Sequence, residues 1–218
     1  MKKMMKAAAV LAAMVMALSL SACSSNDDDK PSDGDGVIAT LPKASGRDPF
    51  KNGYYESTKG KWKFFSFIDK DEKDDNYSYA AKYCKFDTSN RTMTLLYDSK
   101  NEKMDWNSAQ FKYTYDEEKT TITMTLLKIA IPQDIDTIDS DEPMDFELAT
   151  LTEVEKALNK YFSSNDDITR WMERYRKEFE TLLTYRYETS EDNCIKLTLT
   201  SPTPIDDEQS TTLQFVGN

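Results

Sequence analysis

The chain has 218 residues, of which 39 are acidic and 28 basic, so its formal net charge is −11 at pH 7. An acidic surface repels phosphate groups, which argues against nucleic acid or anionic lipid as a binding partner. The sequence contains no histidine. This excludes imidazole-based catalytic triads and histidine-ligated zinc, and it removes the usual general base near neutral pH.

The N-terminus has the layout of a bacterial export signal. Lys2, Lys3 and Lys6 precede an apolar run at residues 7–19. This run is shorter than a membrane span and has the length of a signal-peptide core. We therefore predict a signal peptide at residues 1–22.

A cysteine directly follows this predicted signal peptide. Leu20-Ser21-Ala22-Cys23 resembles the lipobox of bacterial lipoproteins, in which the chain is cut before the cysteine and the cysteine is acylated. The resemblance implies a membrane anchor on Cys23, and two or more acyl chains anchor a protein stably. Ser24 in place of aspartate permits transport to the outer membrane in enterobacterial lipoproteins. Asn26-Asp27-Asp28-Asp29 is similar to the acidic tether of surface-displayed lipoproteins in some bacteria with two membranes. The alternative is an ordinary secretory signal with a chance cysteine.

The anchor is followed by a polar segment. Residues 24–49 are rich in Ser, Asp, Gly and Pro, and they have too little apolar surface to form a core. We predict a lipidated flexible linker at residues 23–49 and a single domain at residues 50–218. A domain of this size can form a stable hydrophobic core without disulfides or bound metal.

Most of this domain alternates between apolar and polar residues, a pattern typical of antiparallel strands with one buried face. Short polar turns separate the alternating runs. We predict eight strands, near residues 62–68, 77–86, 91–97, 111–115, 120–129, 183–187, 194–199 and 211–216. Tyr54 and Tyr55 would contribute a ninth strand if they pair.

The spacing changes after the fifth predicted strand. Residues 130–147 are acidic and have no period, and Thr150 and Glu153 then have the spacing of a helix capping box. A second helix is expected from near Ser164, and its apolar stripe comprises Ile168, Trp171, Met172, Tyr175 and Phe179. We therefore predict a helical insertion at residues 150–179. We expect its apolar stripe to pack on the sheet; the alternative is that the stripe binds a partner protein.

A meander of strands leaves two open edges, and closure into a barrel removes both. Gly60-Lys61-Trp62 is similar to the Gly-x-Trp start of lipocalin-like barrels, where the tryptophan plugs the closed end. Gly53-Tyr54-Tyr55 is a second candidate for that position, like the openings of lipocalin-like lipoproteins in spirochaetes and related bacteria. We predict a mainly β fold, an antiparallel up-and-down, lipocalin-like barrel. A β-sandwich with a helical lid is the alternative.

The aromatic residues indicate what such a barrel would hold. Eight strands enclose a space that side chains fill or that takes one small ligand. Twelve tyrosines are more than a dry core favours, because each buried hydroxyl needs a partner. The candidate cavity residues are Trp62, Phe64, Tyr113, Tyr115, Tyr185 and Tyr187. In the alternative, these rings are buried and their hydroxyls reach the rim.

The sequence predicts no catalytic, cofactor or metal site. Acidic residues cluster in loops, and none lies alone in an apolar strand face where desolvation would raise its pKa. The acidic loop from Asp69 lacks the glycine and glutamate of an EF-hand at its sixth and twelfth positions. Cys84 and Cys194 could form a disulfide or remain two thiols.

We therefore expect non-catalytic binding of a small apolar ligand or a protein partner at the cell envelope. One alternative is a structural or host-facing surface protein with a solid barrel. A carboxylate-based hydrolase is a further alternative, and it requires two acids that converge in a cleft.

Overall fold

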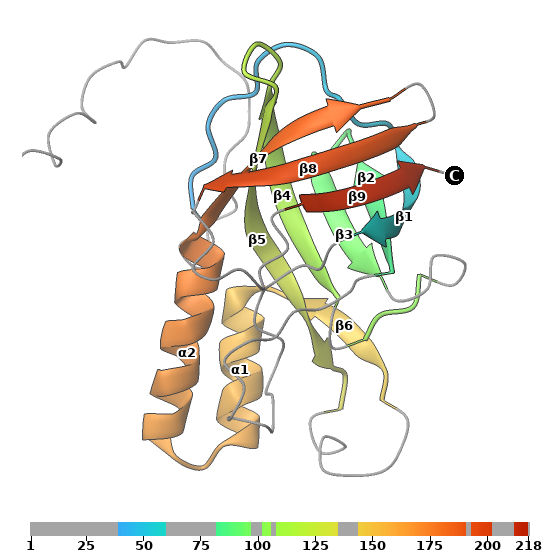
Figure 1. Ribbon diagram of the computed structural model, residues 1–218. Helices are drawn as coiled ribbons and strands as arrows, with labels where there is room; N and C mark the ends of the chain where they lie inside the picture. The colour runs from blue at the N-terminus through green and yellow to red at the C-terminus, as the bar shows by residue number, and fades with distance from the viewer. Residues whose placement is uncertain are drawn as a thin grey trace, which may run out of the picture. The chain divides into compact units, whose positions relative to one another are not determined.

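The computed structural model describes residues 39–59, 82–96, 102–105, 108–134, 144–190, 193–201 and 212–217. These residues form a mainly β fold in which eight antiparallel strands close into a barrel, with a ninth strand and two helices inserted (Figure 1). The predicted fold class is confirmed, and the barrel is closed, unlike a β-sandwich. The predicted signal peptide, Cys23 and the predicted strand at 62–68 lie outside the described residues.

The barrel strands follow one another around the wall in chain order. They are β1 (Gly53–Lys59), β2 (Tyr83–Asp87), β3 (Thr92–Leu96), β4 (Ala109–Asp116), β5 (Thr121–Pro132), β7 (Leu182–Thr189), β8 (Cys194–Ser201) and β9 (Thr212–Gly217). Each pairs antiparallel with the next, and β1 also pairs with β9, which closes the barrel. The first described barrel strand begins at Gly53-Tyr54-Tyr55, the second candidate for the start of the barrel.

β5 is long enough to serve two parts of the fold. Its first half pairs with β7, from Thr121 opposite Arg186 to Thr125 opposite Leu182. Its second half pairs with the short strand β6 (Phe146–Ala149). The sequence pattern does not reveal β6, because four residues are too few to show a period and the preceding stretch is acidic.

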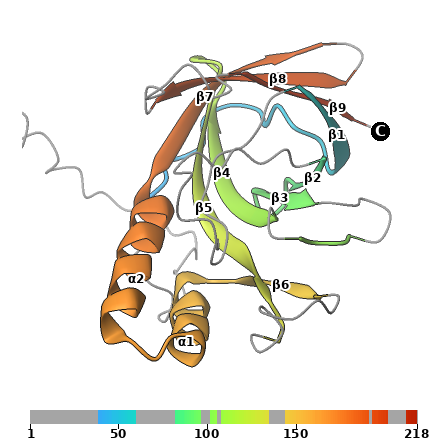
Figure 2. The same cartoon turned by 60° about the horizontal axis from the view of Figure 1, so that its bottom comes forward.

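Two helices follow β6 and lie side by side at one end of the barrel (Figure 2). α1 (Leu151–Tyr161) begins with the predicted capping box, in which the Thr150 hydroxyl accepts from the Glu153 N–H and the Glu153 carboxylate accepts from the Thr150 N–H. α2 (Asn165–Glu180) is capped by Ser164. Its predicted stripe is packed into the core, since Trp171, Met172, Tyr175 and Phe179 are at most 5% exposed.

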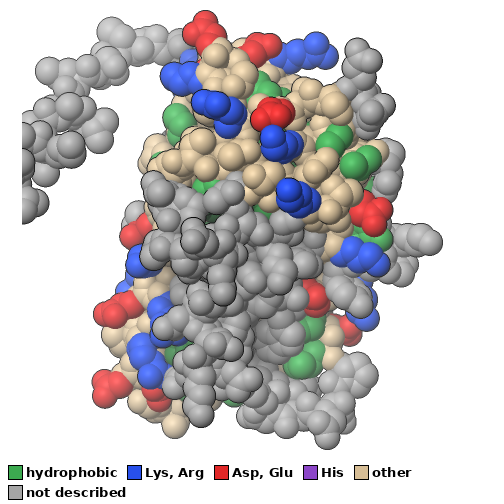
Figure 3. Space-filling view, in the orientation of Figure 1, with side chains coloured by type: hydrophobic (Ala, Val, Ile, Leu, Met, Phe, Trp, Pro, Cys, Tyr) green, Lys and Arg blue, Asp and Glu red, His purple; other side chains and the backbone are tan. Residues whose placement is uncertain are grey.

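The inward faces of the strands are those that the alternation predicts. Ile122 and Met124 on β5, and Leu197 on β8, are completely buried. The side chains that alternate with them face outward and are mostly polar, such as Thr123 on β5 and Lys196 on β8. Figure 3 shows acidic and basic side chains interspersed over the visible strands, without separate regions of one charge. Inward residues thus form the core and outward residues keep the wall hydrated.

Candidate functional site

An irregular segment crosses one end of the barrel before β1 begins (Figure 1). This segment, residues 39–52, is called the strap. The Ala39 N–H donates to the Phe179 carbonyl at the end of α2 (3.4 Å), so packed contacts begin earlier than the domain boundary expected at Phe50. Sequence composition places residues 39–49 in the linker, whereas the structure places them on the barrel.

The strap pairs with an edge of β4 that β3 leaves open. β3 reaches only as far as Lys112 on β4. Beyond that point, Ser45 forms a parallel bridge with Asp116, donating to the Tyr115 carbonyl (2.9 Å) and accepting from the Glu117 N–H (3.0 Å). The exposed strand edge therefore obtains hydrogen-bond partners from the strap.

The strap then turns toward the barrel interior. Gly46 has a φ of +81°, a left-handed conformation that glycine adopts without steric cost. Next, the Arg47 N–H donates to the Glu117 carboxylate (2.8 Å). Asp48 accepts from the Phe50 N–H (2.9 Å) in a local side-chain turn. The left-handed turn at Gly46 and these two hydrogen bonds direct the Phe50 ring into the barrel.

Phe50 belongs to an aromatic cluster that closes this end of the barrel. Its ring is 4% exposed, stacks on Phe86 with centroids 4.0 Å apart, and meets the edge of Tyr113 at 5.3 Å. Tyr55 also contacts Phe86, at 5.3 Å. The strap, β1, β2 and β4 thus each contribute a ring, in geometries that aromatic pairs favour.

The hydroxyls of the two cluster tyrosines bond to the strap. The Tyr113 hydroxyl donates to the Asp48 carboxylate (2.9 Å), and the Tyr55 hydroxyl donates to the Lys51 carbonyl (3.3 Å). Burial raises the pKa of Asp48, against the opposing effects of its hydrogen bonds and of Arg91. Burial and the nearby Asp48 carboxylate raise the pKa of Tyr113 far above its ordinary value. Tyr113 therefore remains a hydrogen-bond donor throughout the physiological pH range.

Four predicted cavity residues lie on one section of the inner wall. Tyr113 and Tyr115 are on β4, Tyr185 and Tyr187 are on β7, and the register places Tyr115, Ile122 and Tyr185 in one row. Tyr113 and Tyr185 are buried, whereas Tyr115 and Tyr187 are half-buried at the edge of the core. A role as ligand contacts stays a prediction for all four.

The remaining predicted cavity residues, Trp62 and Phe64, lie outside the described residues. Conversely, Asp48 and Phe50 are not among the site residues that the sequence pattern predicts. Their only sequence signal is that Asp48-Pro49-Phe50 brings the first aromatic residue after the polar linker.

The described side chains pack the barrel interior tightly. The residues that are at most 2% exposed there include Tyr55, Cys84, Phe86, Met93, Leu95, Phe111, Tyr113, Ile122, Met124, Ile195, Leu197, Leu213 and Phe215. They come from all strands of the wall except β7, where Tyr185 is 5% exposed. These near-zero exposures leave no water-sized space beside the inward side chains named above.

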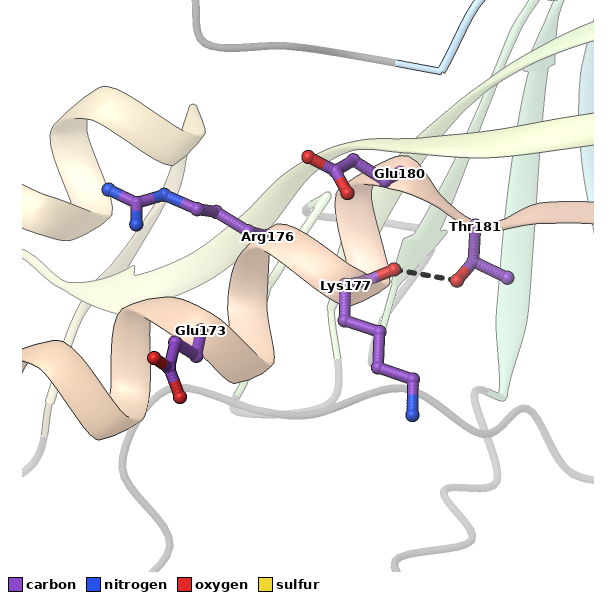
Figure 4. A pocket seen from close by; sticks show the side chains of 5 residues that line it. All are labelled: Glu173, Arg176, Lys177, Glu180 and Thr181. Carbon is purple, nitrogen blue, oxygen red and sulfur yellow. Dashed lines mark hydrogen bonds between the residues drawn. The ribbon is translucent and has the colours of Figure 1, made fainter.

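Two pockets lined by described residues lie outside the barrel. One, of about 440 Å³, runs along the exposed face of α2 (Figure 4). Glu173 and Glu180 are separated there by Arg176 and Lys177, and the Thr181 hydroxyl donates to the Lys177 carbonyl (2.6 Å). Acidic and basic side chains thus alternate along this face of α2.

The second pocket, of about 520 Å³, lies against the outer face of β7, β8 and β9. Its lining includes Cys194, whose sulfur accepts from the Gln214 side-chain amide (3.2 Å), and Lys196, which pairs with Glu188 at 3.1 Å. No group of three metal-ligating side chains occurs among the described residues.

The structure decides the state of the two domain cysteines. Cys84 lies inside the barrel on β2, fully buried, and Cys194 lies on the outer side of β8. β1 and β9 separate these two strands in the wall, and both cysteines are free. Of the two alternatives, the structure supports two separate thiols.

Comparison with known proteins yields no relative: no family model, no curated protein and no solved structure matches the chain. Among the described residues, neither helix has the length and apolar character needed to cross a membrane.

Proposed function

We propose that this protein is a lipid-anchored, non-catalytic binding module of the bacterial cell envelope, and that it binds a protein partner through the outside or the rim of its barrel. The observation that carries this proposal is the packed interior of the described barrel. Thirteen inward side chains that are at most 2% exposed leave the outer surface as the place for recognition. The barrel fold is compatible with such a binding role.

The anchoring part of the proposal is supported by residues 1–23. Acylation of Cys23 on its thiol and new amino group would hold the chain stably to a bilayer, since two acyl chains suffice. From Cys23 to Ala39, an extended chain spans at most about 55 Å. The barrel would therefore meet partners within about that distance of the membrane surface.

The anchor is tested by expressing the full chain and Cys23→Ser in a bacterium with two membranes. We expect the wild type in the membrane fraction, with an intact mass that includes acyl chains and lacks residues 1–22. Cys23→Ser should be found in the soluble fraction. Ser24→Asp serves as the control, because it should change the membrane reached and leave acylation intact. Wild-type protein that is released with an unmodified Cys23 would contradict the anchor.

The binding part is tested on the protein purified from its own host. Native mass spectrometry should show the mass of the chain without a small molecule in the barrel, and crosslinking in intact cells should give a defined adduct with one envelope protein. The two purified proteins should then bind each other without crosslinker. A small molecule that co-purifies in place of any protein partner would favour the ligand-binding alternative. Without either result, the solid barrel is better described as a structural surface protein.

A further inference from the structure

The strap places one of its own side chains where a ligand ring would fit. The Phe50 ring comes from an irregular segment, while the rings of Phe86, Tyr113 and Tyr55 around it come from barrel strands. Withdrawal of Phe50 would leave a ring-sized apolar space, with Phe86 offering its face at the position where Phe50 now stacks.

The strap also supplies a hydrogen-bond acceptor beside that ring. Asp48, two residues before Phe50, accepts from the Tyr113 hydroxyl (2.9 Å). If the strap leaves, Tyr113 loses this partner within a low-dielectric interior, and a buried donor without an acceptor is costly. An incoming molecule with a carboxylate near an aromatic ring would satisfy Tyr113 and stack on Phe86.

The strap has few backbone hydrogen bonds to the barrel, so it can detach while the barrel stays folded. Between Ala39 and Asn52 it has one isolated bridge, Ser45 with Asp116, and belongs to no helix or strand. Its other polar contacts include exposed ones, such as Arg47 with the Glu117 carboxylate. Segments with few ladder hydrogen bonds open at lower free energy than the barrel that they cover.

We propose that the strap is a detachable plug, and that Phe50 and Asp48 occupy a subsite that binds a small arylalkanoic acid when the strap withdraws. This site is separate from the outer surface to which we assign the protein partner. It also does not depend on the lipid anchor. Only molecules whose strap has withdrawn can bind, and these are the minority. The apparent affinity is therefore the intrinsic affinity multiplied by the fraction of open molecules.

The test uses the full chain with Cys23→Ser, so that no acyl chain competes for the site. The probes are 3-phenylpropionate and, as a ring without an acceptor, toluene. Affinity is measured by ligand-observed NMR for the otherwise unchanged chain and for Phe50→Ala. We expect Phe50→Ala to bind 3-phenylpropionate at least about tenfold more tightly, since a strap without its ring contacts is open in a larger fraction of the molecules.

A matched pair of variants locates the bound carboxylate. In the Phe50→Ala background, Tyr113→Phe should abolish the preference for 3-phenylpropionate over toluene, because the donor is lost. Tyr185→Phe removes a different buried hydroxyl from the same inner wall and should leave that preference unchanged. An equal effect of the two substitutions would overturn the assignment of the subsite.

Hydrogen exchange on the chain with its native Phe50 tests strap release directly and does not depend on how Phe50→Ala folds. Saturating 3-phenylpropionate should accelerate exchange of the Ser45 and Arg47 amides, while the Met124 amide on β5 stays protected. If these strap amides are unchanged or become more protected at saturation, or if no binding is seen at millimolar probe, the plug proposal is overturned.

Discussion

Tyrosine hydroxyls in the barrel obtain partners from a segment outside the strands. Tyr55 and Tyr113 are fully packed rings, and their hydroxyls bond to Lys51 and Asp48 of the strap. A buried hydroxyl without a partner costs about 1–3 kcal/mol. The strap therefore allows this barrel to carry aromatic residues with polar tips inside its wall.

The two domain thiols should differ sharply in reactivity. Burial raises the pKa of Cys84 well above its ordinary value, and its side chain is completely buried, whereas Cys194 is partly exposed. Because the thiolate is the reactive form, we expect one fast-reacting thiol in the native Cys23→Ser chain and a second only in urea. Titration with a thiol reagent measures this. Cys194→Ser should remove the fast phase, and its persistence in that variant would contradict the assignment.

Glu178 gives the protein a pH-dependent stability. Burial raises its pKa to about 7, although Lys177 opposes this. Because the folded-state pKa lies above the ordinary value of 4.5, the folded state binds the proton more tightly. Stability is therefore lost as the pH rises from about 4.5 to about 7.

The corresponding substitution is Glu178→Gln, which keeps the shape and removes the charge. We expect it to raise the free energy of unfolding by about 1–2 kcal/mol at pH 8 and by much less at pH 5, a value discounted for the partial exposure of the side chain. Urea denaturation at the two pH values measures the difference. Glu173→Gln on the exposed face of α2 makes the same charge change, and an equal gain there would refute the role of burial.

At the scale of elements, local side-chain patterns set where most helices and strands lie. The expected strand at 91–97 matches β3 (Thr92–Leu96), and the expected run from Thr120 matches the first part of β5. α1 begins directly after Thr150, the residue that the capping-box spacing indicates. These matches follow because periodicity and capping are short-range properties of the chain.

The capping box of α1 should contribute measurably to stability. Thr150→Ala removes the hydroxyl that accepts from the Glu153 N–H, and we expect a loss of about 1 kcal/mol in the free energy of unfolding. Thr150→Ser keeps the hydroxyl and should remain within about 0.5 kcal/mol of the wild type. Urea denaturation compares the three proteins. Similar losses in both variants would mean that the hydroxyl is not what stabilises the helix start.

At the scale of the whole molecule, β9 is the strand that closes the barrel. It pairs with β8 on one side and with β1 on the other, joining segments from the two ends of the domain. Truncation before Thr212 would leave both neighbours with unpaired edges. We expect that truncated chain to lose its cooperative thermal unfolding transition, measured by circular dichroism.

Phe215→Ala is the control for this truncation. It removes a fully buried side chain of β9 and leaves the backbone pairing in place. We expect a cost of about 3–5 kcal/mol with cooperative unfolding retained. If the truncated chain also unfolds cooperatively, then closure by β9 is not required for the fold.

The sequence by itself determined the hairpin alternation, the helical insertion and the inward residues of most strands, because each depends on neighbours within a few positions. Tertiary structure alone decided the pairing of β1 with β9, the addition of β6 to the far half of β5, and the separation of Cys84 from Cys194. It also decided that residues 39–52 form a strap with Phe50 inside the barrel. Such pairings join segments that are distant along the chain, and no local period encodes which distant edge a segment will meet.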